Sequence, residues 1–144
     1  MRRALWSIVA VLVLAAAALY HLSGPGSGPR SATDLERRKE TAARLFVAEI
    51  APVGGEPSVG PLATWQLILS HSDGTPVTDA TVRLDGGMPD HGHGLPTRPE
   101  VTAEPAAGRY LVEGLKFSMP GLWVLTFAIS TPRGSDEVSF NVAL

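Results

Sequence analysis

The residues best suited to chemistry lie close together in one stretch, residues 86–99, which contains Met88, His91 and His93. Its glycines and prolines disfavour both a helix and an ordinary strand, so a shaped loop is expected there. Residues i and i+2 of an extended segment point the same way, which would let His91 and His93 direct two imidazoles at one point. Gly92 between them leaves the backbone unobstructed. This is a chelating arrangement.

The chemical types of these side chains indicate which metal they would bind. Imidazole binds copper, zinc, nickel and iron, whereas the thioether of Met88 is a soft ligand that favours copper, and Cu(I) above all. The stretch therefore predicts a copper site. A turn rich in glycine and proline, whose histidines are merely solvated, is the alternative interpretation, because short motifs often match by chance.

Length and composition restrict the class of protein. With 144 residues, 44% hydrophobic residues and a formal net charge of −2, the chain fits one small domain plus an apolar segment. The near-neutral charge provides no basic stripe, so nucleic acid is not an expected partner. Because the chain has no cysteine, disulfides, thiolate metal sites and a cysteine nucleophile are all excluded.

The N-terminus predicts that the protein enters a membrane. Arg2 and Arg3 precede an apolar run over residues 4–22, close to the roughly 20 residues that cross a bilayer as a helix. A cleaved signal peptide is the alternative, but the run continues past a potential cleavage site at residues 15–17. We therefore favour a retained anchor over residues 1–22. The domain is then expected outside the cytoplasm, tethered to the cell membrane, with lipid as one partner.

Residues 23–43 are expected to connect this anchor to the domain. Residues 23–29 have a linker composition, with glycine, serine and proline and no apolar side chain to bury. Thr33 and Glu36 have the spacing of a capping box, which predicts a short charged helix over residues 31–40. A frayed, solvated extension of the linker is the alternative.

From residue 44 onwards, apolar residues recur at every second position, which is the period of a half-buried strand. Residues 44–144 thus predict an all-β fold, an antiparallel immunoglobulin-like β-sandwich of about seven short strands. The strands are expected near residues 46–50, 65–69, 80–84, 100–103, 110–112, 123–129 and 138–142. The core expected between the sheets consists of Trp65, Val82, Leu84, Tyr110, Val112, Trp123, Leu125, Phe127, Phe140 and Val142.

The order of the strands predicts which loops lie together. If each strand reverses the one before it, the connections over residues 51–61, 86–99 and 115–121 share one end of the sandwich. This brings Met119 to the stretch with the histidines, whereas His71 falls at the opposite end and is not a candidate ligand. Because the first strand would enter from that opposite end, the site is expected on the membrane-distal loops.

Three runs carry a family resemblance: residues 73–80 (DGTPVTDA), 87–94 (GMPDHGHG) and 114–123 (GLKFSMPGLW). They resemble the YtkA-like domain family, which is related to FixH-like proteins, and the resemblance covers about the last 100 residues, the size of one immunoglobulin-like domain. It implies a membrane-tethered extracytoplasmic β-sandwich with a role in copper handling or in assembly of metal-containing respiratory complexes. On the matching positions, the candidate copper ligands are Met88, His91, His93 and Met119.

Three functions are compatible with these features. The first is a copper chaperone or carrier that exchanges copper with a membrane protein, and the second is a non-enzymatic assembly or interaction module for a respiratory or metal-transport complex. The third, which we favour least, is an accessory domain of a metalloenzyme. Catalysis by the chain itself is not expected, because its serines lack an elbow motif and the only acids near the stretch are Asp90 and Glu100.

Overall fold

The structure is a computed structural model that describes residues 34–144. The predicted membrane segment over residues 1–22 and the linker up to residue 33 lie outside these residues. Within the described part, no helix has the length and apolar character needed to cross a membrane.

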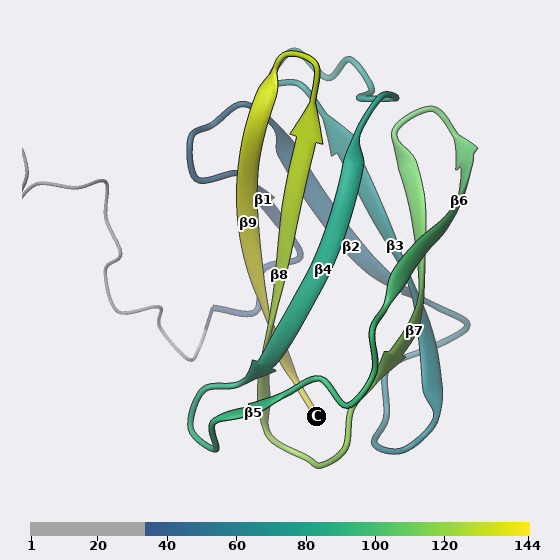
Figure 1. The fold of residues 1–144 in the computed structure, drawn as a ribbon, viewed down its shortest axis with the longest axis vertical. Coiled ribbons are helices and arrows are strands. Elements are labelled where there is room, and N and C mark those ends of the chain that lie inside the picture. Colours follow the sequence, from purple (N-terminus) through teal and green to yellow (C-terminus); the bar gives the residue numbers. More distant parts are fainter. Residues whose placement is uncertain (1–33) are drawn as a thin grey trace, which may run out of the picture. The chain divides into compact units, whose positions relative to one another are not determined.

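Residues 34–144 form two antiparallel β-sheets that face each other (Figure 1). The strands are β1 (Arg38–Glu40), β2 (Val47–Val53), β3 (Leu62–Ser70), β4 (Thr81–Met88), β5 (His93–Gly94), β6 (Glu100–Ala106), β7 (Arg109–Lys116), β8 (Leu122–Thr131) and β9 (Gly134–Ala143). One sheet has the order β1-β2-β3-β7-β6, and the other has the order β5-β4-β8-β9. The prediction of an all-β fold with two antiparallel sheets is confirmed.

Alternating apolar side chains from both sheets form the core. Trp65 of β3 and Trp123 of β8 come from different sheets, and both are fully buried. Burial alternates along β8, so Trp123 and Phe127 point to the same face, as the period of two predicted. Leu84 is the one predicted core residue that is only partly buried. The others are buried: Trp65, Val82, Tyr110, Val112, Trp123, Leu125, Phe127, Phe140 and Val142.

The strand registers place three connections at one end of the domain. In the first sheet, Val53 lies opposite Thr64 and Leu62 lies opposite Lys116, so the β2–β3 connection and the end of β7 are neighbours. A short loop joins β7 to β8, and Gly87 of β4 lies opposite Val124 of β8. These connections lie at the bottom of Figure 1, together with the β4–β5 hairpin. We call this the hairpin end. The three connections that meet there are the ones that the strand order predicted to lie together.

The entry of the chain into the domain differs from the prediction. Arg38–Glu40 is strand β1, not the end of a charged helix, so the sheet begins before residue 44. Because β1 is antiparallel to β2, it runs away from the hairpin end. Arg37, just before β1, lies 3.5 Å from Glu56 of the β2–β3 connection. The described chain therefore does not enter from the opposite end, and the prediction of a membrane-distal site loses its geometric basis.

Two cations explain why this segment is a strand. The guanidinium carbon of Arg37 lies 4.9 Å from the ring centroid of Trp65, and Nζ of Lys39 lies 5.6 Å from that of Phe140. Such contacts are favourable, and the aliphatic stems of these side chains cover apolar surface at the edge of the core. Tertiary packing thus overrides the local helix signal.

Asp136 joins two parts of the fold at the end opposite the hairpin end. Its carboxylate accepts hydrogen bonds from Oγ1 of Thr41 at 2.5 Å, from the amide of Ala43 at 2.9 Å and from the amide of Leu45 at 3.1 Å. Burial raises the pKa of this carboxyl, but these bonds and one from the amide of Glu137 outweigh burial, so the pKa is lowered overall. The ionised carboxylate ties the β1–β2 connection to β9.

We predict that Asp136→Asn lowers the free energy of unfolding by about 1–2 kcal/mol at pH 7, because an amide cannot accept all of these bonds. Since the pKa of Asp136 is lower in the folded state than in the unfolded chain, the contribution of the carboxylate is complete above about pH 5. It is lost as the pH falls through the folded pKa. Urea titrations at several pH values should show the difference between the two proteins shrinking below about pH 4. A difference that stays constant down to about pH 2 would contradict this account.

Candidate metal centre

The β4–β5 hairpin carries three of the four predicted ligands. Met88 is the last residue of β4 and lies opposite His93 of β5. The chain turns through residues 89–92, where Gly92 has a φ of 63°, a value that glycine adopts without strain. The amide of His91 donates a hydrogen bond to the carbonyl of Met88 at 3.1 Å. The hairpin thus fixes the backbone of both histidines relative to Met88.

The two imidazoles are neighbours, although not for the predicted reason. His91 lies in the turn and His93 in β5, so they are not alternate residues of one extended segment. Their ring centroids are 6.1 Å apart with 21° between the ring planes, and both residues are exposed. Two imidazoles that share an ion at an ordinary metal–nitrogen distance of about 2 Å have centroids about 5–6 Å apart. The separation of the two rings is therefore close to that of imidazoles on a shared ion, but their planes are nearly parallel, so both rings would have to turn to direct a nitrogen at one point.

Met88 belongs to the core as well as to the hairpin. Its side chain is 2% exposed and packs in the main hydrophobic cluster. The β7–β8 connection passes close to it, since a Cβ built on Gly121 would lie 2.7 Å from Cε of Met88. Met88 also lines a shallow hollow beside the hairpin that is shared with His93. The thioether is thus a buried group in contact with a loop, whereas the imidazoles lie on the surface.

Met119 reaches the hairpin end on the β7–β8 connection, as the strand order predicted. Its side chain is partly buried against the core. Its carbonyl accepts a hydrogen bond from Nε1 of Trp123 at 3.1 Å. Two residues later, Gly121 and Leu144 exchange backbone hydrogen bonds of 3.0 and 3.1 Å. The connection that carries Met119 is therefore fixed to the core and to the last residue of the chain.

The four candidate ligands thus lie at the hairpin end in two groups. The imidazoles of His91 and His93 are exposed on the hairpin, and the thioethers of Met88 and Met119 lie at or under the β7–β8 connection. Residues 34–144 contain no group of three or more His, Cys, Asp or Glu side chains that could hold a metal ion. A metal ion held here by more than two side chains must therefore use a thioether, which is a property of copper rather than of zinc.

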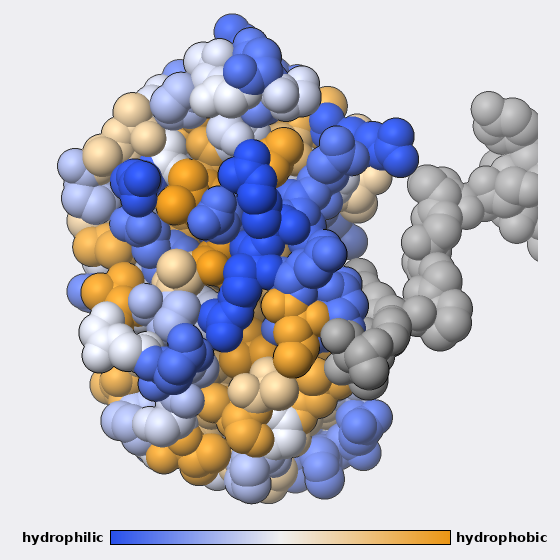
Figure 2. Space-filling model, turned by 180° about the vertical axis from the view of Figure 1, so that it is seen from behind, coloured by the Kyte–Doolittle hydropathy of each residue, from blue (hydrophilic) through white to orange (hydrophobic). Residues whose placement is uncertain are grey.

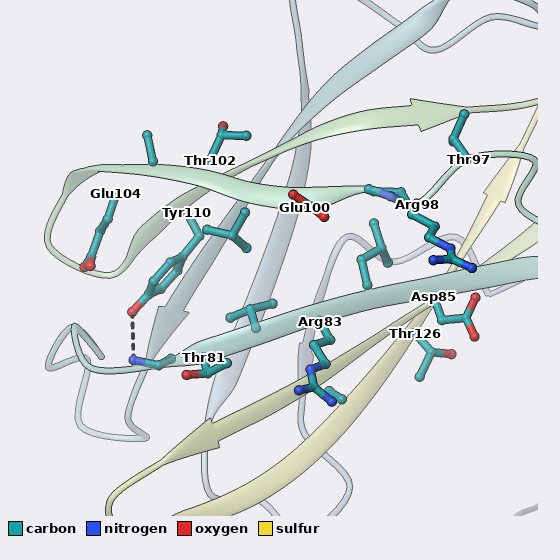
Figure 3. A pocket seen from close by; sticks show the side chains of 17 residues that line it. Thr81, Arg83, Asp85, Thr97, Arg98, Glu100, Thr102, Glu104, Tyr110 and Thr126 are labelled. Carbon is teal, nitrogen blue, oxygen red and sulfur yellow. Dashed lines mark hydrogen bonds between the residues drawn. The ribbon is translucent and has the colours of Figure 1, made fainter.

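A second concavity runs along the open side of the sandwich between β4 and β6 (Figure 3). Tyr110 lines it and accepts a hydrogen bond from the amide of Ala80 at 3.3 Å, drawn as a dashed line. Burial raises the pKa of this phenol. The charged side chains in the lining are of both signs: Arg83, Asp85, Arg98, Glu100 and Glu104. Since no His, Cys or Met lines this groove, it is not the predicted metal site.

Exposed aliphatic side chains gather at the hairpin end. Val53, Val59 and Leu62 are 50%, 41% and 67% exposed, and we call them the aliphatic rim. Figure 2 shows the face of the β1-β2-β3-β7-β6 sheet, where hydrophobic residues lie beside and below a run of hydrophilic residues that descends through the middle. Val59 pairs with Phe117 in an isolated β-bridge, so the rim adjoins the connection that carries Met119. The sequence pattern did not reveal this rim, because single aliphatic residues in loops have no period.

We predict that the two methionines differ in their contribution to stability. Met88→Ala should lower the free energy of unfolding by about 2–4 kcal/mol, because it leaves a cavity in the core. Met119→Ala should cost clearly less, because Met119 is only partly buried. Urea denaturation of both variants measures this, with Met88→Leu as a control that keeps the apolar volume. Equal losses for the two alanine variants would contradict the burial described above.

Comparison with solved structures gives two similar folds. A DUF4426 family protein from Pseudomonas aeruginosa PAO1 is 15% identical with a TM-score of 0.54, and the match covers 76% of this chain and 96% of that protein. The ZirS C-terminal domain is 17% identical with a TM-score of 0.41, over 84% of this chain and 79% of that domain. At such identities, the first likeness indicates the fold alone. No curated protein sequence matches the chain.

A comparison with models of protein families gives a more specific result than the likeness in fold. The model of the YtkA-like family matches residues 48–128, which is more than half of the chain and runs from β2 into β8. The matched part includes the β4–β5 hairpin, the β7–β8 connection and all four candidate ligands. This protein therefore belongs to the YtkA-like family, as the three sequence runs suggested.

Proposed function

We propose that this protein is a non-enzymatic copper carrier, which binds one copper ion at the hairpin end through Met88, His91, His93 and Met119. The observation that carries the proposal is the pair of exposed imidazoles, with centroids 6.1 Å apart, on a hairpin whose neighbouring residues include two methionines. A soft ion that accepts both nitrogen and thioether ligands fits this set best, and copper is that ion.

The two groups of ligands suit different oxidation states. Thioethers bind Cu(I) well and Cu(II) poorly, whereas imidazole binds both. We therefore infer that Cu(I) uses all four side chains and that Cu(II) is held mainly by His91 and His93. Because imidazole binds a metal only in its deprotonated form, affinity for both ions should fall on acidification.

The setting of the site supports a role in copper transfer at a membrane. The apolar run over residues 4–22 favours a single-pass anchor in the cell membrane, with the domain on the extracytoplasmic side. A copper-donating or copper-accepting membrane protein is the partner that such a tethered domain would serve.

The longer strands follow the order of a constant-type immunoglobulin domain, with β2-β3-β7-β6 facing β4-β8-β9. This order supports the immunoglobulin-like assignment.

A second candidate function is an assembly or interaction module for a respiratory or metal-transport complex. The aliphatic rim favours it, because Val53, Val59 and Leu62 expose apolar surface at the end that carries the site. In this reading the two methionines and the rim contact a partner, and the histidines are incidental. Copper binding distinguishes the two functions.

We predict that the full chain, purified in detergent, binds one equivalent of Cu(I) in competition with a chromophoric chelator and one equivalent of Cu(II) by direct titration. Replacing His91 and His93 together by Ala should lower affinity for both ions by at least 100-fold, because it removes both nitrogen ligands. Met119→Leu should weaken Cu(I) selectively, because only the thioether is lost.

The control for these variants is His71→Ala. His71 is at the end opposite the hairpin and its ring lies 5.8 Å from that of Phe46, so its loss should leave copper affinity unchanged. Electron paramagnetic resonance of the Cu(II) form should show coupling to two imidazole nitrogens. If the double histidine variant binds Cu(I) as well as wild type while circular dichroism shows it folded, the copper site is wrong and the interaction module is the better reading.

A further inference from the structure

We propose that two residues that are not ligands, Trp123 and Gly121, set the preference of the hairpin end for Cu(I). This inference rests on the proposed copper function and identifies which residues favour the binding of Cu(I) over Cu(II). Both residues act through the β7–β8 connection. Trp123 positions the backbone of Met119, and Gly121 positions the thioether of Met88.

Trp123 is a rigid support for the Met119 backbone. Its side chain is fully buried, and its ring lies edge-on to that of Phe117 with centroids 5.4 Å apart and 68° between the planes. From this fixed position, its indole N–H donates to the carbonyl of Met119 at 3.1 Å. This bond fixes the backbone from which the Met119 thioether projects. Hydrogen bonds made directly to a ligating group typically contribute 10–100-fold to metal affinity, so an effect near the lower end is expected for a bond to the backbone.

Gly121 determines where the thioether of Met88 can lie. Its φ of 127° is a conformation that side-chain-bearing residues rarely adopt, and a Cβ there would be 2.7 Å from Cε of Met88. That methyl carbon is bonded to the candidate ligand atom, the sulfur. Because the backbone of Gly121 is hydrogen-bonded to Leu144 in both directions, the connection cannot simply move away. A side chain at this position therefore meets the methyl end of Met88, which is flexible and moves more readily than the hydrogen-bonded backbone of Gly121.

The imidazoles are positioned by a different part of the structure. His91 and His93 depend on the β4–β5 hairpin, through the pairing of Met88 with His93 and the bond from the His91 amide to the Met88 carbonyl. Neither Trp123 nor Gly121 makes a hydrogen bond with these two histidines in the described structure. A disturbance of the β7–β8 connection should therefore weaken Cu(I), which uses the thioethers, and spare Cu(II), which uses the imidazoles.

The first test compares Trp123→Phe with Trp65→Phe in the full chain. Both replacements shrink a fully buried indole and keep an aromatic ring. Nε1 of Trp65 has no hydrogen-bond partner within residues 34–144, so only the Trp123 variant loses a bond. We expect Trp123→Phe to lower Cu(I) affinity about tenfold and to leave Cu(II) affinity within about twofold of wild type. Trp65→Phe should change neither affinity.

The second test compares Gly121→Ala with Gly55→Ala. Gly55 has a φ of 129°, close to that of Gly121, but a Cβ there would meet no atom within 4 Å, so it matches the backbone strain without the contact. Gly121→Ala should lower Cu(I) affinity about tenfold, and Gly55→Ala should not. In a Met88→Leu background, the added effect of Gly121→Ala on Cu(I) should disappear, because the thioether that it displaces is already absent.

The outcomes separate this inference from the function on which it rests. If wild type binds neither Cu(I) nor Cu(II), the copper function fails. If wild type binds both ions but Trp123→Phe and Gly121→Ala match their controls, the copper function survives and the positioning roles are wrong. Equal losses of Cu(I) and Cu(II) affinity in Trp123→Phe would also overturn the inference, because they would mean a general structural defect.

Discussion

The register of β8 between β4 and β9 is the constraint on which the whole hairpin end depends. Gly87 lies opposite Val124, and Leu122 lies opposite Ala143, so the β4–β5 hairpin, the β7–β8 connection and the end of β9 meet at one place. A shift of one residue would turn every side chain of β8 to the opposite face and move its buried set out of the core. Burial of Trp123 and its neighbours in the core prevents that shift. The same packing therefore holds the connections that carry the candidate ligands in place.

The sequence was sufficient for the main elements because the signals behind them are local and repeated. A period of two along β3, β4, β8 and β9 predicted the strands and nearly all of the buried core, which hydrophobic burial then enforces. The order of reversing strands placed Met119 at the same end as Met88 and the histidines, and His71 at the other end. These conclusions needed no knowledge of individual contacts, since parity along an antiparallel chain determines which loops are neighbours.

The features that sequence reasoning missed depend on contacts between distant residues. Residues 38–40 have a helical composition, yet the free edge of β2 and the aromatic rings of Trp65 and Phe140 make a strand the better solution. Because β1 is antiparallel to β2, the described chain does not enter the domain from the end opposite the hairpin, as the strand count had predicted. The burial of Met88 was missed because residues 86–99 were predicted to form a loop, whereas β4 continues to Met88 and buries it on the same face as Val82.

The division between thioethers packed in or against the core and exposed imidazoles has a physical basis. A thioether carries no charge and needs no hydrogen bond, so Met88 can pack in the core without the desolvation cost that a buried carboxylate would bear. A neutral imidazole is polar and binds a metal through its free ring nitrogen, so an exposed ring can exchange an ion with a partner without first leaving the core. A site at the boundary of the core can therefore use both kinds of ligand with little rearrangement of the fold. Any ion that binds the folded chain but not the unfolded chain also stabilises the fold, so a metal ion that reached Met88 would reinforce the packing that holds the hairpin and the β7–β8 connection together.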